Sequence, residues 1–496
     1  MSSFALARGS RISLILFLFA TSFCVFALQS GDALMYLALA RDFVLNGDWS
    51  SRDPYLYSLP NAELVWQHEY LSYLIFYAVH AVFGFPGLIL LKTVLWGAVF
   101  LTVLRAEPRQ RNESWLWIGL WVLAVLAGSF RFIERASLFS DLFCVLLVSW
   151  LLPRSRIDRG LLLRISLLFL LWIQVHPGFP LGWALVGLWT LWHLIHTPSF
   201  RDYKRLAWLS LPLALMFLNP LGWEGIVYPI RFALNEARTL KEFNFEWLPS
   251  YHPLFRFAPE TLAFWALSGF ASMIVIRERA WMDLRTWFAL FAFVAATQSV
   301  RFVPWASFVM ITAIKPWCEL RGRRHFGVKL EYAALALILA LSLKNFTTGY
   351  KSSSGQRLAH LGLDPKFFPE TTTEFLRQRP IPGRLYNTHD FGSYLIWRKM
   401  TPIFHHGFVT DMRFYREEVA GVFQSQERFL ELVRRHGWTM LLVEKHGAYR
   451  YFHRILSPLP DWKIVAEDES SYLIYYLPDS NNGRDESPQN SRSGQQ

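Results

Sequence analysis

Apolar residues along roughly the first two thirds of the chain fall in blocks of roughly 14–20 residues, separated by short basic connectors. A helix crosses a bilayer with about 20 apolar residues and satisfies its own backbone hydrogen bonds there. The pattern therefore predicts an α-helical polytopic membrane protein with about eleven transmembrane helices, several of them short. The predicted spans are Ile12–Leu28, Pro86–Leu104, Trp115–Phe130, Ser137–Leu152, Leu161–Val175, Leu181–His196, Leu206–Leu218, Glu260–Ile276, Thr286–Val300, Phe302–Pro316 and Val328–Leu343.

One further apolar block, Tyr70–Phe83, has only about 14 residues, which is nearer the length of an interfacial helix than of a span. Aromatic residues recur along it at helical spacing, as expected at the level of the lipid headgroups. We therefore predict an amphipathic surface helix here. The aromatic residues are Trp66, Tyr70, Tyr73 and Tyr77.

With that block on the surface, the arginine-rich connectors all lie on one side of the membrane, which the positive-inside rule makes the cytoplasm. The N-terminus is then cytoplasmic. The first block also resembles a signal peptide with a cleavage sequence at Val25-Phe26-Ala27, but an uncleaved span is favoured because many spans follow. The predicted external segments are Gln29–Phe85, Asn219–Pro259 and Lys344–Gln496.

The polar C-terminal part is predicted to form a separate soluble domain. Residues 1–343 are the transmembrane domain, with 29–85 as its first external loop, and a linker at 344–367 leads into an α/β domain at 368–478. The tail, 479–496, lacks apolar residues and is predicted to be disordered. Predicted helices are Glu370–Arg379, Tyr394–Trp397 and Gln424–His436, and predicted strands are Arg384–Asn387, Pro402–His406, Thr439–Val443, Lys463–Ala466 and Tyr472–Tyr476.

Composition agrees with a membrane protein: 53% of the residues are hydrophobic and only 18% are charged, against about a quarter in soluble domains. The net charge of +12 then reflects arginines in loops and does not indicate nucleic-acid binding. The three cysteines lie in or beside apolar blocks without CxxC spacing, which disfavours both a disulfide framework and a thiolate metal site.

Acidic residues of the first external loop are the first candidates for chemistry. Asp32 stands at the membrane boundary in Gly31–Tyr36, where a carboxylate is costly unless it has a partner or a function. Asp32 could instead cap the following helix, and Asp53 before a proline could be turn chemistry. Glu69 and His68 could be plain polar residues at the rim, but both adjoin the aromatic stripe, so we expect them at the site.

Isolated cations at the outer boundary are the second group. Guanidinium groups bind phosphate in a bidentate way, so these residues suit a lipid phosphate. Snorkelling is the alternative for each of them, and Arg131 could also pair with Glu134 on one helical face. The candidates are Lys92, Arg131, Arg135 and Arg301.

Polar residues in short external turns and after predicted strands complete the set of candidates. His176 and Glu246 lie in external segments near the membrane, where plain turn chemistry is the alternative. Asp390, Asp411 and Arg413 follow predicted strands, where α/β domains often place ligands.

Together these residues resemble the GT-C superfamily of integral membrane glycosyltransferases, in particular a bacterial multi-pass group within or near it. The resemblance covers most of the chain and consists of short motifs. They are Gly31-Asp32, Trp66-Gln67-His68-Glu69-Tyr70-Leu71, Val175-His176-Pro177-Gly178-Phe179, Leu218-Asn219-Pro220-Leu221-Gly222-Trp223, Glu246-Trp247, Arg301-Phe302-Val303-Pro304, Phe391-Gly392-Ser393-Tyr394-Leu395 and Asp411-Met412-Arg413.

The resemblance implies a polyprenyl-phosphate sugar as donor and inverting transfer, of a hexosyl or pentosyl group, on the periplasmic side of a bacterial inner membrane. The acceptor would be a lipid, a glycan or a protein. Asp32 would be the catalytic base, with Asp53 and Glu69 as further catalytic candidates. The other candidates, Tyr36 included, would bind substrate. No cofactor is certain, and a divalent cation (Mg²⁺ or Mn²⁺) on Asp32 and Asp53 stays open.

Physical reasoning favours the same function. Glycosyl transfer needs a base near the acceptor hydroxyl and cations near the departing phosphate, both at headgroup depth because a polyprenyl tail stays in the bilayer. A transporter of polyprenyl-linked glycans would place charges in mid-span, whereas the predicted spans are apolar in their centres. A catalytically degenerate GT-C-like scaffold or binding protein remains the other alternative.

Overall fold

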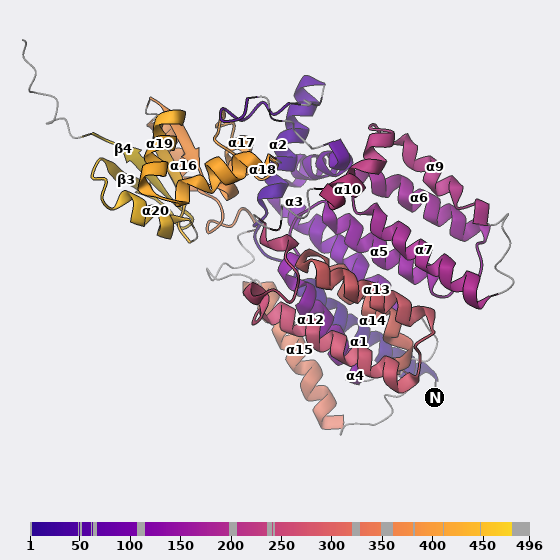
Figure 1. The fold of residues 1–496 in the computed structure, drawn as a ribbon. Helices are drawn as coiled ribbons and strands as arrows, with labels where there is room; N and C mark the ends of the chain where they lie inside the picture. The colour runs from indigo at the N-terminus through magenta and orange to yellow at the C-terminus, as the bar shows by residue number, and fades with distance from the viewer. Residues whose placement is uncertain are drawn as a thin grey trace, which may run out of the picture. The chain divides into compact units, whose positions relative to one another are not determined.

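The computed structural model describes residues 2–47, 49, 52–60, 62, 67–106, 115–197, 206–235, 241, 244–319, 328–348, 361–379, 382–409, 411–446 and 448–478. The chain divides into two compact units (Figure 1). The helical unit comprises Met1–Trp49 and Val65–Asp364, and the α/β unit comprises Ser50–Leu64 and Pro365–Gln496.

Every predicted span coincides at least in part with a helix of the helical unit, within a few residues at most ends. The first prediction runs too far, because its helix ends at Ser22, and the block at 206–218 holds only short helices. The helices are α1 (Ser2–Ser22), α2 (Gly31–Asn46), α3 (Tyr70–Arg105), α4 (Trp115–Gly128), α5 (Ser137–Leu151), α6 (Arg159–Val175), α7 (Phe179–His196), α9 (Ser210–Leu215), α10 (Trp223–Asn235), α12 (Pro259–Glu278), α13 (Leu284–Gln298), α14 (Val303–Glu319) and α15 (Val328–Thr348).

Helix α3 joins two groups of helices in this unit (Figure 1). It packs against α5 and α6 on one side and against α1 on the other, while α4, α12, α13 and α14 pack among themselves. Large aromatic side chains fill the core between α3, α4 and α14, where ring pairs such as Trp96–Phe132 and Phe100–Phe308 lie 4.3 and 5.4 Å apart between centroids. Such pairs add to the stabilisation from apolar burial.

Helix α3 breaks at Gly84, whose φ of 63° lies in the left-handed region that favours glycine. Pro86 follows at once and lacks the N–H that a continuous helix would use. The break falls at the boundary that the sequence predicts between the short block Tyr70–Phe83 and the span Pro86–Leu104. The surface position of the first part stays a prediction, and Trp66 of its aromatic stripe lies outside the described residues.

Two of the described helices are long and apolar enough to cross a membrane by themselves, Tyr70–Arg105 and Pro259–Glu278. A third crossing results if Ser210–Leu218 and Trp223–Leu234, which meet at an angle of 103°, are counted as one broken span. The other apolar helices in the described part are shorter. The number of eleven spans therefore stays a prediction.

The α/β unit contains a four-stranded sheet in the order β1-β2-β4-β3, with β1 and β2 parallel and the other pairs antiparallel. Helix α16 packs on β3 and β4, and α19 packs on β2. The sequence missed only α20 among the longer elements. They are α16 (Glu370–Gln378), β1 (Arg384–Asn387), α17 (Gly392–Trp397), α18 (Met412–Phe414), α19 (Gln426–His436), β2 (Trp438–Glu444), α20 (Tyr449–Leu456), β3 (Trp462–Glu467) and β4 (Ser471–Tyr476).

The strand predicted at Pro402–His406 is wrong. This segment makes only an isolated bridge, in which Ile403 pairs with Leu56 from the first loop. The Ile403 N–H donates to the Tyr55 carbonyl at 2.8 Å, and the Tyr57 N–H donates to the Ile403 carbonyl at 3.1 Å. Pro402 has no N–H to extend the ladder.

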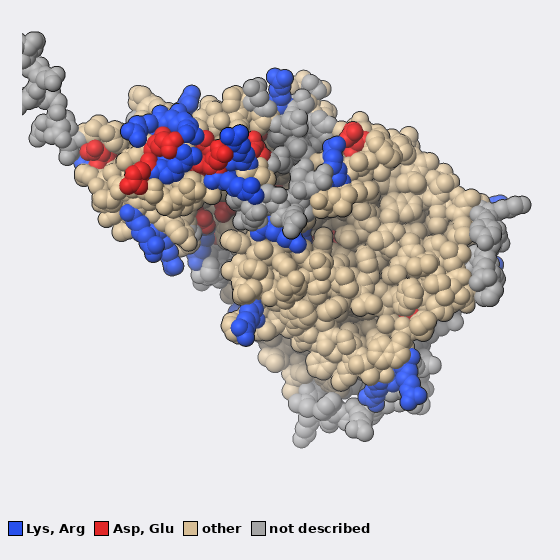
Figure 2. Space-filling model, viewed as in Figure 1, with Lys and Arg blue, Asp and Glu red and all other residues tan. Residues whose placement is uncertain are grey.

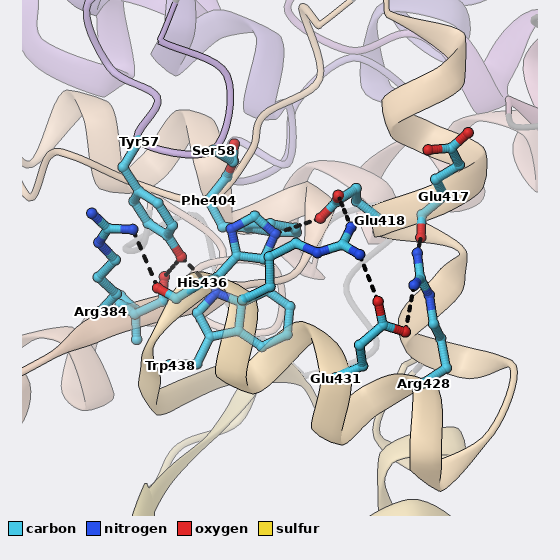
Figure 3. A network of polar contacts seen from close by, with 12 residues as sticks. Tyr57, Ser58, Arg384, Phe404, Glu417, Glu418, Arg428, Glu431, His436 and Trp438 are labelled. Carbon is cyan, nitrogen blue, oxygen red and sulfur yellow. Dashed lines mark hydrogen bonds and ion pairs between the residues drawn. The ribbon is translucent and has the colours of Figure 1, made fainter.

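Residues 50–64 thus belong to the α/β unit, although the sequence predicts one continuous loop over 29–85. Tyr57 fixes this segment in the network of Figure 3, because its hydroxyl donates to the Leu385 carbonyl (2.8 Å) and accepts the Trp438 indole N–H (2.8 Å). The polar linker predicted from 344 starts later, since α15 continues to Thr348. Residues 479–496 lie outside the described part.

Charge is distributed differently on the two units. The visible face of the helical unit in Figure 2 is mostly uncharged, whereas acidic and basic side chains gather on the α/β unit. Ion pairs there include Arg428–Glu431 at 2.7 Å and Arg435–Glu418 at 2.8 Å. An uncharged face is what a membrane-embedded helical unit requires.

Candidate functional site

Arginines and carboxylates from separate elements meet in the helical unit where several apolar helices end. Asp32 lies in the first turn of α2, and Arg135 lies just before α5. The other members lie on short 3₁₀ turns: Arg131 on η2 (Ser129–Arg131), Glu246 on η5 (Phe245–Trp247) and Arg301 on η7 (Val300–Phe302). We call these five residues the charge cluster.

Glu246 is the centre of the charge cluster. Its Oε2 lies 2.6 Å from Arg131 Nη1, and Arg135 Nη1 lies 2.7 Å from both of its oxygens. Burial disfavours the carboxylate, but the charges of Arg131, Arg135 and Arg301 outweigh it and hold the pKa of Glu246 well below its ordinary value. Glu246 is therefore ionised and keeps two guanidinium groups in place.

Asp32 pairs with the same arginine from the other side. Arg135 Nε lies 3.0 Å from Asp32 Oδ2, and the Asp32 side chain is 34% exposed. Asp32 does not cap α2, because the cap is Ser30, whose hydroxyl accepts the Ala33 N–H at 3.4 Å. The capping alternative is therefore wrong, and a charge partner explains this carboxylate at the boundary.

Arg301 is the member of the charge cluster without a carboxylate at ion-pair distance in the described part of the chain. Its guanidinium lies 4.2 Å from the ring centroid of Trp247, a cation–π contact. Burial and the charge of Arg131 lower the pKa of Arg301 to about 10, so it is still a cation at neutral pH. Two hydrogen bonds fix its turn against η5, from the Ser299 hydroxyl to the Glu246 carbonyl (2.8 Å) and from the Val300 N–H to the Leu248 carbonyl (2.9 Å).

Glu69 forms a second, more buried part of the site on η1 (Gln67–Glu69). His176 Nε2 lies 3.5 Å from Glu69 Oε1, and the Tyr73 hydroxyl lies 3.4 Å from Oε2. Burial, followed by the charge of Asp32, raises the pKa of Glu69 to about 8. His68 stacks on Tyr228 of α10 at 4.8 Å, and burial lowers its pKa to about 4.

The structure thus brings most of the predicted boundary residues together in one unit. Tyr36 joins them by stacking on Tyr73 at 4.7 Å between centroids, beside Glu69. His176 is the link to α5, because its Nδ1 lies 2.6 Å from the Ser140 hydroxyl. Asp141, next to Ser140, is buried as well.

Lys92 is not a boundary cation. It is fully buried in α3 and pairs at 2.6 Å with Glu134, which is also fully buried, and its ammonium lies 3.6 Å from the Phe26 ring centroid. Lys92 therefore does not belong with the phosphate ligands that the sequence predicts. The Arg131–Glu134 pair is wrong for the same reason, since Glu134 serves Lys92 and Arg131 serves Glu246.

Asp53 lies in the α/β unit, where both of its oxygens are engaged. Its Oδ2 lies 2.5 Å from His406 Nε2 and its Oδ1 accepts the Tyr55 N–H at 2.8 Å, with both ionisable side chains almost fully buried. Asp32 is held by Arg135. The described residues contain no group of three or more His, Cys, Asp or Glu side chains that could hold a metal ion, and a divalent cation on the two aspartates stays a prediction.

The remaining candidates of the α/β unit are dispersed along its loops. Asp411 caps α18 by accepting the Phe414 N–H at 3.0 Å, and the exposed Arg413 pairs with Glu417 at 2.9 Å. Asp390 is exposed on the turn η8 (His389–Phe391) after β1. Asp411 and Arg413 thus have ordinary structural roles, a helix cap and an ion pair. The position of Asp390 gives no indication of a chemical role.

Sequence reasoning missed the residues that position the site. Two of them could have been found in the sequence. Ser30 is a residue type that caps helices and stands one position before α2, and Trp247 directly follows the candidate Glu246. Ser140 and Trp172 gave no such signal, because each stands within an apolar block. Their hydrogen bond of 2.7 Å exists only once α5 and α6 have packed.

No family model and no curated protein matches the sequence. Solved structures do match over nearly the whole chain. ArnT from Cupriavidus metallidurans bound to undecaprenyl phosphate superposes with a TM-score of 0.53 at 13% identity, over 97% of this chain and 99% of that chain. Its apo state gives 0.50 at 14% identity, over 95% and 98%.

The archaeal oligosaccharyltransferase AglB from Archaeoglobus fulgidus, in complex with an inhibitory peptide and a dolichol-phosphate, also matches. Its TM-score is 0.54 at 11% identity, over 91% of this chain and 71% of that chain. ArnT and AglB are membrane glycosyltransferases of the GT-C superfamily. The chain therefore shares the fold of these two proteins, which confirms the predicted resemblance at the level of fold.

Proposed function

We propose that this protein is a membrane glycosyltransferase that moves a sugar from a polyprenyl-phosphate donor to an acceptor, with inversion at the anomeric carbon. The GT-C fold supports the reaction class, because two structural neighbours are bound to undecaprenyl phosphate and dolichol-phosphate. The observation that carries the proposal is Arg301, a guanidinium with no carboxylate partner in the described residues, held against Trp247 and beside the ionised Glu246.

Arg301 is proposed as the main ligand of the donor phosphate. Charge-assisted hydrogen bonds from guanidinium to phosphate are short and bidentate, and they strengthen where water is scarce. Arg131 and Arg135 are already paired with Glu246 and would add mainly long-range attraction. Because Trp247 lies against the guanidinium, Arg301 is oriented before the lipid arrives.

Asp32 is proposed as the base that takes the proton of the acceptor hydroxyl. Arg135 anchors Oδ2 of Asp32, whereas Oδ1 has no partner in the described part of the chain. The Asp32 side chain is about one third exposed. A base needs this combination of a fixed position and an open lone pair. Asp53, with both oxygens engaged in the α/β unit, is proposed to stabilise that unit.

We place the reaction at the periplasmic face of a bacterial inner membrane, following the arginine pattern of the loops. The donor sugar would be a hexose or a pentose, and the acceptor a lipid, glycan or protein. Glu246, His68 and Tyr36 would shape the site around the sugar. No step requires a metal ion held by Asp32 and Asp53 together.

A transfer assay with the full-length protein in nanodiscs tests the proposal. A panel of radiolabelled undecaprenyl-phosphate hexoses and pentoses is offered together with cell-envelope lipids and glycans. We expect wild type to consume one donor, and the Asp32→Asn variant to do so roughly 100-fold more slowly, the low end of the range for a general base. Melting should be unchanged, because Ser30 caps α2.

Two results would contradict this function. Wild type that consumes no donor in the panel but binds polyprenyl phosphate would favour a non-catalytic GT-C-like protein. Net movement of an intact lipid-linked sugar across a vesicle membrane, without transfer, would favour a transporter. Full activity of the Asp32→Asn variant would leave the reaction class standing and remove Asp32 as the base.

A further inference from the structure

The buried carboxylate Glu69 is surrounded by groups that govern its proton. Its neighbours from every packed element are Asp32 and Tyr36 of α2, His68 of η1, Tyr73 of α3, His176 before α7, and Arg301 of η7. Among them only Arg301 is a permanent cation, and burial with the charge of Asp32 outweighs it, so Glu69 has a pKa of about 8. The site thus holds two carboxyl groups in different environments: Asp32 is partly exposed and paired with Arg135, whereas Glu69 is buried and has a raised pKa.

A chain of polar contacts through Ser140 holds the His176 imidazole against Glu69. His176 Nδ1 accepts the Gly178 N–H at 3.0 Å, so the ring proton is on Nε2, which faces Glu69 Oε1. The Ser140 hydroxyl accepts the Trp172 indole N–H at 2.7 Å and can therefore donate to His176 Nδ1 at 2.6 Å. His176 thus faces Oε1 of Glu69, and the Tyr73 hydroxyl faces Oε2 at 3.4 Å.

Close packing shows that this arrangement tolerates little change. A methyl group at Gly178 would lie 2.3 Å from the Ser140 hydroxyl oxygen and 2.8 Å from His176 Nδ1. Such contacts are shorter than real ones, so a side chain at 178 would displace the serine or the imidazole. A merely structural turn would not require this approach to two polar atoms.

We propose that Glu69 is the proton donor of the site, which protonates the phosphate oxygen as it leaves the sugar, and that Ser140 and His176 are its positioning residues. The inference rests on the proposed glycosyl transfer. It adds a general acid to the base and the phosphate ligand.

The proposed step balances in atoms and charge. The acceptor oxygen forms a bond to the anomeric carbon while the bond from that carbon to the phosphate oxygen breaks, and the electron pair stays on that oxygen. The acceptor proton moves to Asp32 and the Glu69 proton moves to the departing oxygen, so the lipid leaves as a phosphomonoester monoanion. A proton then passes from Asp32 to Glu69, which restores both groups.

Protonation of Glu69 is first tested without any turnover. Infrared difference spectra of wild type against the Glu69→Gln variant, in nanodiscs, should show a protonated carboxyl band at pH 6 that disappears as the pH rises through about 8. The matched control is Glu224→Gln, which removes an exposed carboxylate of α10 and should give no such band. Absence of the band in the Glu69 difference at pH 6 would overturn the inference even if the enzyme is active.

Catalysis is tested with the donor that wild type consumes. The Glu69→Gln variant should transfer about 100-fold more slowly. It should recover most of that loss with a short-chain donor fluorinated next to the phosphate ester, whose departing phosphate needs no proton. Equal loss on both donors, or no loss, would contradict a general acid. A wild type that transfers nothing would instead contradict the proposed function.

Ser140→Ala tests the positioning role. The His176 N–H favours the ionised form of Glu69, and Ser140→Ala should loosen the imidazole that carries it. The pKa of Glu69 then rises, so the high-pH limb of kcat/KM should move upward by about half to one pH unit. Ser149→Ala is the matched control, since in the described part of the chain that hydroxyl on the same helix bonds only to the Leu146 carbonyl at 2.7 Å. The His176→Gln variant, which keeps a donor at the same place, should retain the wild-type limb. Identical limbs for Ser140→Ala and Ser149→Ala would contradict the role.

Discussion

Two sets of opposite charges in the helical unit are built in opposite ways. Lys92 and Glu134 form a closed pair, fully buried and matched one to one. The charge cluster shares Glu246 between Arg131 and Arg135, keeps carboxylates about one third exposed, and leaves Arg301 without an acid in the described residues. The closed pair has no capacity for a ligand, whereas the cluster can accept an anion.

The comparison shows why sequence position alone misassigned Lys92. A lysine in the outer third of a span and an arginine at its end look alike in one dimension. Their difference lies in whether a partner from another segment neutralises them. Glu134 is 42 residues away from Lys92 in the chain, and only the packing of α3 against α5 and its preceding turn joins them.

Breaking the closed pair should give the largest effect on stability. Glu134→Leu leaves the ammonium of Lys92 buried without a counter-charge, so we expect a loss of about 3–5 kcal/mol in the free energy of unfolding. Thermal unfolding in detergent, followed by tryptophan fluorescence, measures this. The double variant Lys92→Met/Glu134→Leu should restore most of the stability, and a double variant as unstable as the single one would contradict a purely structural pair.

The buried pair of the α/β unit should behave as a closed pair too. Asp53→Asn removes the charge that faces His406, and we expect a loss of about 1.5–3 kcal/mol in the stability of that unit. Hydrogen exchange of β1 and β2 reports it. Asp411→Asn is the control, because asparagine caps a helix about as well as aspartate. If Asp53→Asn leaves the stability of the α/β unit unchanged but abolishes sugar transfer, Asp53 has a catalytic role and not a structural one.

The smallest effect should come from the helix that carries Asp32. Ser30→Ala removes the cap of α2 and should cost about 1 kcal/mol, while Asp32→Asn should cost much less stability. Comparing the two melting curves separates support of the helix from chemistry at the cluster. The reverse order of stabilities would show that Asp32, and not Ser30, holds the start of α2.

Periodicity predicted the helices well because apolar blocks bounded by arginines and glycines leave few alternatives for the backbone in a bilayer. It also singled out Asp32, Glu69, Arg135 and Arg301, which the structure brings together in the helical unit. It failed for Pro402–His406, whose β-like composition is used in an isolated bridge to the distant residue Leu56. It missed the partners of Lys92 and Asp53, Glu134 and His406, because an ion partner far along the chain leaves no local signal.

Affinity for the lipid phosphate tests the central claim most directly. The full-length protein in nanodiscs is titrated with a short-chain polyprenyl phosphate, and binding to wild type, Arg301→Gln and Arg277→Gln is measured by calorimetry. Arg277 is an exposed arginine in the last turn of α12 and serves as the matched control. We expect Arg301→Gln to lose about 1.5–3 kcal/mol, roughly 10- to 150-fold in Kd, and Arg277→Gln to bind like wild type. Equal affinity of Arg301→Gln and wild type would contradict the account.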